Sequence, residues 1–255
     1  MSQKQYSVLT FVFGNYERLR DPLEISPHCE YVAVTDNPNL TSNIWNIKYL
    51  PSEFDSADGF TKSFYVRYHP YQFVSTDICI VMDGSVLIKR SLDYLVYKFV
   101  QSKCECSFMI HWNQINAIDE YEYWTKMRGY SSIQAQKCLA FMSAIGYNKS
   151  YKGCFETGFK ICSKTVNVLK LHEFVYNCLV KLGTDKNHIE RVDQSIFSAI
   201  INTKFTNLHI FPVTHQIIQN DWLQYCKHNS VHEETYNINW DNMYLFNHPV
   251  EVFLL

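Results

Sequence analysis

Short apolar runs and helical apolar periods alternate along the chain. Runs that end in turn residues predict strands, and apolar residues that recur three and four positions apart predict helices. The expected strands are 6–13, 30–35, 44–50, 77–82, 106–111, 155–162 and 207–212, and the expected helices are 61–74, 89–101, 131–145, 163–182 and 190–202. This alternation indicates an α/β domain in which helices cover the faces of a sheet.

The length of 255 residues suits one large α/β domain. We expect residues 1–212 to form it. Residues 213–255 are rich in Asn, His, Trp and Tyr without a period, so we expect them to form a wrapping or lid segment of the same domain.

The composition and charge of the chain argue against several classes of function. The chain has 23 Lys and Arg against 25 Asp and Glu, a net charge of −2, which disfavours a nonspecific binder of nucleic acid. No apolar run approaches the roughly eighteen residues of a transmembrane span, and peripheral membrane association stays open. The nine cysteines include no C-x-x-C pair and mostly lie in apolar runs, so we expect reduced thiols and a cytoplasmic protein.

Polar residues follow three of the predicted strands. Gly14 and Asn15 follow the first strand, Asp36 follows the second, and Asp83 opens the turn Asp83-Gly84-Ser85 after the fourth. Ligands of open α/β sheets bind at the carboxyl ends of the strands, so these residues predict a binding edge. The glycine patterns of dinucleotide-binding folds and P-loop enzymes are absent from the sequence.

Asp83 is the most informative of these residues. It ends the apolar run Ile78-Cys79-Ile80-Val81-Met82 and precedes a glycine, which permits a close approach of the backbone. An acid in this place binds a ligand or a metal, or it stabilises the turn through its own backbone. The segment alone leaves both interpretations open.

Several segments, in this order, resemble a known family. They are Thr35-Asp36-Asn37-Pro38, Lys62-Ser63-Phe64-Tyr65-Val66-Arg67, Val81-Met82-Asp83-Gly84-Ser85-Val86, Phe108-Met109-Ile110-His111, Phe155-Glu156-Thr157-Gly158 and Arg191-Val192-Asp193-Gln194. Over about residues 6–212 the chain resembles GT-A glycosyltransferases, and most of all the glycosyltransferase domain of plant Golgi proteins and bacterial polysaccharide clusters, which is distantly similar to glycosyltransferase family 8.

The resemblance implies a GT-A-like, Rossmann-type mixed sheet and a hexosyltransferase-like activity. A sugar would move from a nucleotide-diphosphate-sugar to a hydroxyl acceptor in glycan or polysaccharide synthesis. Glu156 and Asp193 would contact the transferred sugar as catalytic residues. The residues expected to bind the nucleotide-sugar are Gly14, Asn15, Asp36, Lys62, Arg67, Asp83, His111, Thr157, Gly158 and Gln194.

Most of these residues also have a structural interpretation. Asp36 precedes Pro38 and could be a turn acid, and Asp193 could be a first-turn acid favoured by the helix dipole. Lys62 could be a surface cation with a buried stem, and His111 could be a core histidine. For Glu156 the functional interpretation is favoured, because an isolated acid in an apolar strand needs a partner.

A metal is the cofactor that the resemblance implies. In GT-A enzymes a D-x-D motif binds Mn²⁺ or Mg²⁺ against the diphosphate, and here Asp83 and Ser85 would be the ligands. Ser85 replaces the second acid, so metal dependence stays open. The same departure keeps an alternative function in view, a non-catalytic nucleotide- or glycan-binding protein with a degenerate site.

Overall fold

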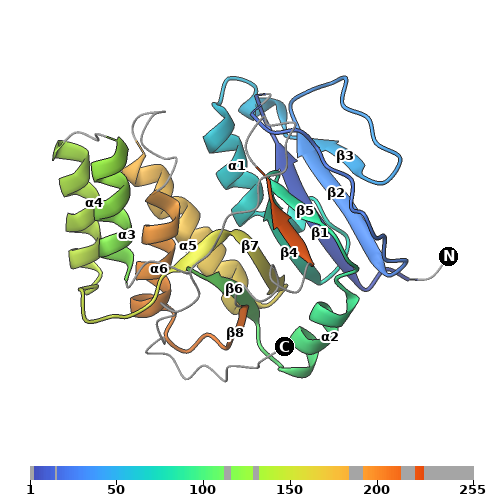
Figure 1. Ribbon diagram of the computed structural model, residues 1–255. Helices are drawn as coiled ribbons and strands as arrows, with labels where there is room; N and C mark the ends of the chain where they lie inside the picture. Colours follow the sequence, from blue (N-terminus) through green and yellow to red (C-terminus); the bar gives the residue numbers. More distant parts are fainter. Residues whose placement is uncertain are drawn as a thin grey trace.

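A seven-stranded mixed sheet forms the centre of the protein (Figure 1). The computed structural model describes residues 3–14, 16–111, 116–128, 132–183, 192–213 and 222–226. Its strands are β1 (Tyr6–Val12), β2 (Cys29–Thr35), β3 (Asn46–Tyr49), β4 (Ile78–Asp83), β6 (Cys106–Ile110), β7 (Phe155–Ser163) and β8 (Ile210–Val213). The strand order across the sheet is β3-β2-β1-β4-β7-β6-β8.

One strand runs against the others. β1, β2, β3 and β4 are mutually parallel, and β6 is parallel to β8, whereas β7 is antiparallel to both of its neighbours, β4 and β6. The first residues of β7 therefore lie at the edge where β4 and β6 end. This reversal brings Glu156 and Thr157 to the same edge as Asp83.

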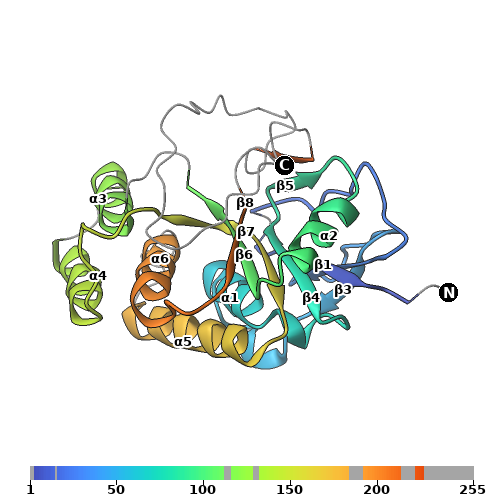
Figure 2. The same cartoon turned by 90° about the horizontal axis from the view of Figure 1, so that it is seen from below.

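The described residues form six helices, four of which cover the faces of the sheet while two pack on another helix beyond its edge, and a small second sheet adds to one face. The helices are α1 (Gly59–Tyr68), α2 (Asp93–Gln101), α3 (Ala117–Arg128), α4 (Ser132–Ala144), α5 (Val166–Leu182) and α6 (Val192–Lys204), and the second sheet pairs β5 (Val86–Ile88) with β9 (Leu223–Tyr225). Figure 2 shows α1, α5 and α6 on one face of the large sheet, with α2 and β5 on the other. The expected α/β architecture, a mixed sheet flanked by helices, is confirmed.

Separate apolar clusters hold the two layers to the sheet. Phe64 and Tyr68 of α1 join the buried residues of α5 and α6, while Leu95 and Phe99 of α2 pack with the other face of β1 and with β5. Each of these side chains is almost fully buried. At about 25 cal/mol per Å² of apolar surface removed from water, these clusters supply most of the stabilisation of the fold.

Local chemistry explains where α1 begins and ends. The Asp58 carboxylate accepts from the backbone N–H of Phe60 and of Thr61 at 2.9 Å, which caps the helix. The helix ends at Tyr68 because the residue before a proline avoids the helical conformation, and Pro70 begins a short 3₁₀ turn, Pro70–Gln72. The periodicity predicted one helix over 61–74, which is wrong beyond residue 68.

The chain after β8 is described only in part. β9 pairs antiparallel with β5, the strand that follows the Asp83 turn. The rest of 214–255 lies outside the described residues, so the expected wrapping or lid segment stays a prediction. Among the helices that the structure describes, none has the length and apolar character that crossing a membrane requires.

Candidate functional site

Residues from four separate segments converge at the edge where β4 ends. Met82 of β4 is in register with Phe159 of β7, so Asp83 lies beside the Thr157-Gly158 stretch. The pairing of β6 with β7 is interrupted between Phe108 and Met109. Such bulges redirect side chains and are common next to functional sites.

Arg67 is the centre of this convergence. From the last turn of α1, its Nη2 donates to Asp83 Oδ1 at 2.5 Å, and its Nη1 donates to Asp193 Oδ2. Thr157 Oγ1 donates to the same Asp193 oxygen at 2.7 Å. One guanidinium thus joins carboxylates from β4 and α6, a geometry suited to the planar fork of arginine.

Burial sets the electrostatics of this group. Asp193 is only 4% exposed, and burial raises the pKa of its carboxyl above the ordinary value although Arg67 and Thr157 oppose the shift. Burial alone would lower the pKa of Arg67, but the carboxylates of Asp83 and Asp193 outweigh it and raise that pKa. The Asp83 side chain is about one third exposed and is the member of the group most open to a ligand.

A second ion pair lies at the end of β2. Lys62 Nζ is 3.0 Å from Asp36 Oδ2, and the N–H of Gly14 donates to Asp36 Oδ1 at 3.1 Å. Gly14 has a φ of +60°, a conformation that favours glycine. Asp36 therefore ties the end of β1 to α1, and the expected residues Gly14, Asp36 and Lys62 do lie together.

A pocket of about 350 Å³ opens between the ends of β1 and β2. Its volume falls within the range of small-molecule sites, roughly 300–1,000 Å³. Polar and apolar side chains share the lining, which consists of Val12, Glu17, Arg18, Leu19, Thr35, Asp36, Asn37 and Leu40. Asp36 belongs both to this lining and to the ion pair with Lys62.

The other expected residues occupy varied places. Glu156 and Gly158 are half-buried in β7, and His111 directly follows β6, where its N–H donates to the Cys154 carbonyl at 2.8 Å. Gln194 is in the first turn of α6, and its Nε2 donates to Glu120 Oε1 of α3 at 3.0 Å. Asn15 lies outside the described residues.

The sequence analysis missed four residues near this edge. Glu120 is buried and accepts hydrogen bonds from Gln194 and Ser195, but α3 lacks the apolar period that would have revealed it. Glu17, Arg18 and Arg20 follow β1. A charged run directly after a strand, in Tyr16-Glu17-Arg18-Leu19-Arg20, is the signal that could have identified them.

The expected metal ligands can be tested against this geometry. Asp83 Oδ1 already accepts from Arg67, and Ser85 offers a single hydroxyl on a buried residue. Across the described residues there is no group of three or more His, Cys, Asp or Glu side chains placed to hold a metal ion. Mg²⁺ is commonly held by one or two carboxylates together with water and substrate phosphates, so the expected ligation by Asp83 and Ser85 stays a prediction.

No protein-family model and no curated protein sequence matches the chain. Among the solved structures that resemble it is mouse xyloside xylosyltransferase 1 in its apo form, with 10% sequence identity, 83% of this chain and 86% of that chain covered, and a TM-score of 0.43. This likeness concerns the course of the backbone and assigns no role to a residue.

Proposed function

We propose that this protein is a glycosyltransferase that binds a nucleotide-diphosphate-sugar at the carboxyl edge of the sheet and transfers the sugar to a hydroxyl acceptor. One observation carries the proposal. Asp83, Thr157 and Asp193 belong to three separate segments that resemble glycosyltransferase motifs, and all three meet at Arg67, which belongs to a fourth. If the similarity of these short motifs were due to chance, there would be no reason for the four segments to lie together in the fold.

The nucleoside would occupy the pocket between the ends of β1 and β2. Asn37 and the backbone beside it offer donors and acceptors for a base or a ribose, and Leu19 and Leu40 offer apolar surface. Arg18 also lines this pocket, is exposed, and has no acid within ion-pair distance among the described residues. We assign to Arg18 the side of the pocket that faces the diphosphate, because an uncommitted guanidinium suits phosphate oxygens.

The residues around Arg67 would act on the sugar. In the transfer the bond between the anomeric carbon and the diphosphate oxygen breaks, its electron pair leaves with the diphosphate, and the acceptor oxygen bonds to the carbon as its proton departs. Arg67 holds the carboxylates of Asp83 and Asp193 in fixed positions, so they need not reorganise as positive charge develops on the sugar. Glu156, half-buried at the start of β7, would contact a sugar hydroxyl or accept the proton of the acceptor.

Nucleotide binding is the first test. A ligand that binds only the native state raises the melting midpoint by mass action, so uridine or guanosine diphosphate should stabilise the chain, assayed both with Mn²⁺ and with EDTA. A panel of nucleoside diphosphates that leaves the midpoint unchanged at millimolar concentration would overturn the proposal.

Product release is the second test. Incubation with nucleotide-sugars and a hydroxyl acceptor should liberate nucleoside diphosphate, and Asp193→Asn should slow that release. Asp93→Asn is the matched control, because Asp93 also accepts two side-chain hydrogen bonds, from Tyr6 and Ser26, but lies at the start of α2. Binding without product release from any donor would instead support a nucleotide- or glycan-binding protein.

A further inference from the structure

The turn after β4 is in unusually close contact with the segment after β1. A Cβ placed on Gly84 would lie 2.9 Å from the carbonyl oxygen of Phe11 and 3.1 Å from Glu17 Cβ. Real Cβ atoms do not approach a backbone oxygen so closely, so no larger residue fits at Gly84 unless the segment moves. The Asp83 turn is therefore packed tightly against both β1, at Phe11, and the segment after it, at Glu17.

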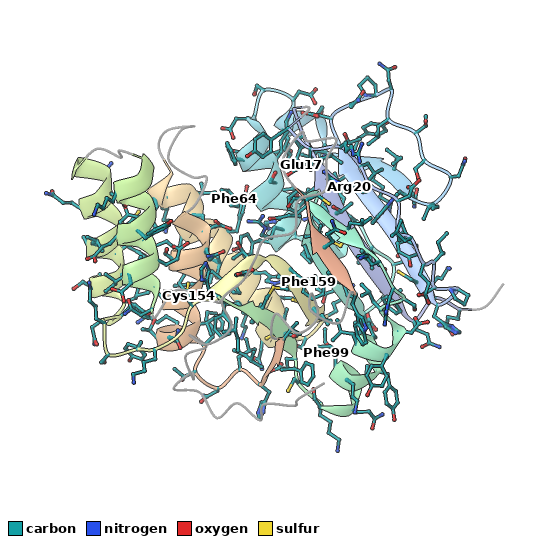
Figure 3. All side chains as sticks on the ribbon, viewed as in Figure 1. Glu17, Arg20, Phe64, Phe99, Cys154 and Phe159 are labelled. Carbon is teal, nitrogen blue, oxygen red and sulfur yellow. The ribbon has the colours of Figure 1, made fainter. Side chains whose placement is uncertain are left out.

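Arg20 fixes this contact. Its Nη1 donates to the Gly84 carbonyl at 2.7 Å and to the Arg18 carbonyl at 3.3 Å, and it lies 3.7 Å from Glu17 Oε2. The side chains of Arg20 and Glu17 are 6% and 9% exposed, and Figure 3 shows them close together at the upper end of the sheet. A buried hydrogen bond from a charged donor is worth more than an exposed one.

The backbone of Arg20 is held as well. Trp45 Nε1 donates to the Arg20 carbonyl at 3.1 Å, and the Trp45 ring packs edge-on against Tyr31 of β2. Trp45 is almost fully buried. Arg20 is thus anchored on the core of the sheet at its backbone and on the Asp83 turn at its guanidinium.

We propose that Arg20 is a positioning residue that couples the pocket wall to the Asp83 turn. Glu17, Arg18 and Leu19 line the pocket, and Arg20 directly follows them. A ligand that orders this wall would also fix the Gly84 carbonyl, and with it the Asp83 carboxylate one residue earlier. The expected effect on ligand binding rests on the proposed function. The role of Arg20 in holding the turn rests on the Arg20–Gly84 contact.

Hydrogen exchange tests the structural part without any ligand. Arg20→Met removes the donor to Gly84, so the amides of 84–88 should exchange at least about tenfold faster than in the wild type. Lys48→Met is the matched control, because Lys48 Nζ also donates to a backbone carbonyl, that of Phe73 at 2.6 Å, away from the turn. Equal exchange at 84–88 in both variants would overturn the proposal.

A double-mutant cycle tests the coupling itself. The effects of Arg20→Met and Asp83→Asn on nucleotide-sugar affinity should be non-additive by about fivefold or more, whereas Lys48→Met and Asp83→Asn should be additive. If the effects of Arg20→Met and Asp83→Asn are additive, the proposed coupling is wrong, even if the wild type binds its donor. A wild type that binds no nucleotide would defeat the proposed function instead, and the exchange experiment would still decide whether Arg20 holds the turn.

Discussion

Two buried cations, Arg67 of α1 and Lys160 of β7, have contrasting surroundings. Arg67 is held between the carboxylates of Asp83 and Asp193 at the carboxyl edge of the sheet. Lys160 of β7 is 1% exposed, and no carboxylate of the described residues lies within ion-pair distance of it. Its Nζ is 3.2 Å from His172 Nε2 and 4.5 Å from the centre of the Tyr68 ring.

The pKa values follow this difference. Burial lowers the pKa of Lys160 to about 8, which the nearby Cys162 thiol opposes and the charge of Arg67 reinforces. Burial and the charge of Lys160 lower the pKa of His172 well below its ordinary value. The pKa of Arg67 is raised, because two carboxylates compensate its burial.

The contrast separates a candidate site from a structural cluster. Burying a charge among neutral groups costs free energy. A buried charge between two acids, one of them partly exposed, presents fixed charges to whatever binds at the edge. We therefore assign Lys160, His172 and Tyr68 to the core, and Arg67, Asp83 and Asp193 to the candidate site.

The largest expected effect follows from removing Arg67. Arg67→Met leaves Asp193 buried beside Asp83 without a counter-charge, and breaking a buried pair in this way costs about 3–5 kcal/mol of unfolding free energy. Urea unfolding measures the loss. The double variant Arg67→Met with Asp193→Leu should recover part of it. A loss below about 1 kcal/mol would mean that the two carboxylates do not depend on Arg67.

Catalysis should be the next most sensitive property. Glu156→Gln keeps the shape of the side chain and removes its charge. The variant would therefore lose a charge-assisted hydrogen bond that is made only in the transition state. We expect the transfer rate to fall roughly ten- to hundredfold. Steady-state kinetics should show the fall in kcat and little change in KM. Glu105→Gln is the control, because Glu105 accepts from Thr165 and Asn167 away from the site. If Glu156→Gln transfers the sugar at the wild-type rate, Glu156 has a structural role and no catalytic one.

Lys160 should behave in the opposite way to Arg67. Lys160→Met replaces a buried charge by an apolar side chain, and we expect a gain of about 1–2 kcal/mol in stability at neutral pH. Because the pKa is about 8 in the folded chain and 10.5 ordinarily, the unfolded chain holds more protons between these values. Wild-type stability should therefore rise with pH across that window, and the advantage of the variant should shrink. Unfolding at several pH values checks both statements, and destabilisation by Lys160→Met would contradict them.

A third, exposed cation should have the smallest effect. Arg18→Gln should weaken the binding of a nucleoside diphosphate by about 1 kcal/mol, since exposed pairs contribute little, and should leave the binding of the bare nucleoside unchanged. Calorimetric titration of both ligands measures the difference. Arg90→Gln, at an exposed arginine outside the pocket lining, is the control. If Arg18→Gln weakens the binding of the nucleoside and of the nucleoside diphosphate equally, Arg18 does not contact the phosphates.

Much of the fold could be predicted from the sequence, and much of the site could not. The strands predicted from the sequence overlap every strand of the large sheet. In buried strands such as β1, β2 and β6, burial on both faces leaves a continuous apolar signal, whereas β3 is an exposed edge strand without one. β5 and β9 are too short for such a signal, and α3 carries acids and aromatics without a period.

The convergence on Arg67 depends on tertiary structure. Thr157 meets Asp193 because β7 runs antiparallel to β4, and no local pattern specifies that direction. Lys160 could have been singled out from the sequence in the same way as Glu156, because it is also a charged residue inside an apolar strand and needs a partner. What the sequence could not distinguish is which of the two charges lies at the open edge.

Photoaffinity labelling tests most directly whether the carboxyl edge of the sheet binds the nucleotide of the donor. Uridine and guanosine diphosphates that carry an azide on the base should crosslink to peptides containing residues 17–19 or 35–40, which line the pocket between β1 and β2. The unmodified nucleotide should compete for this labelling, and Lys160→Met should label as the wild type does. Competed labelling confined to α2, α4 or α5 would contradict the account.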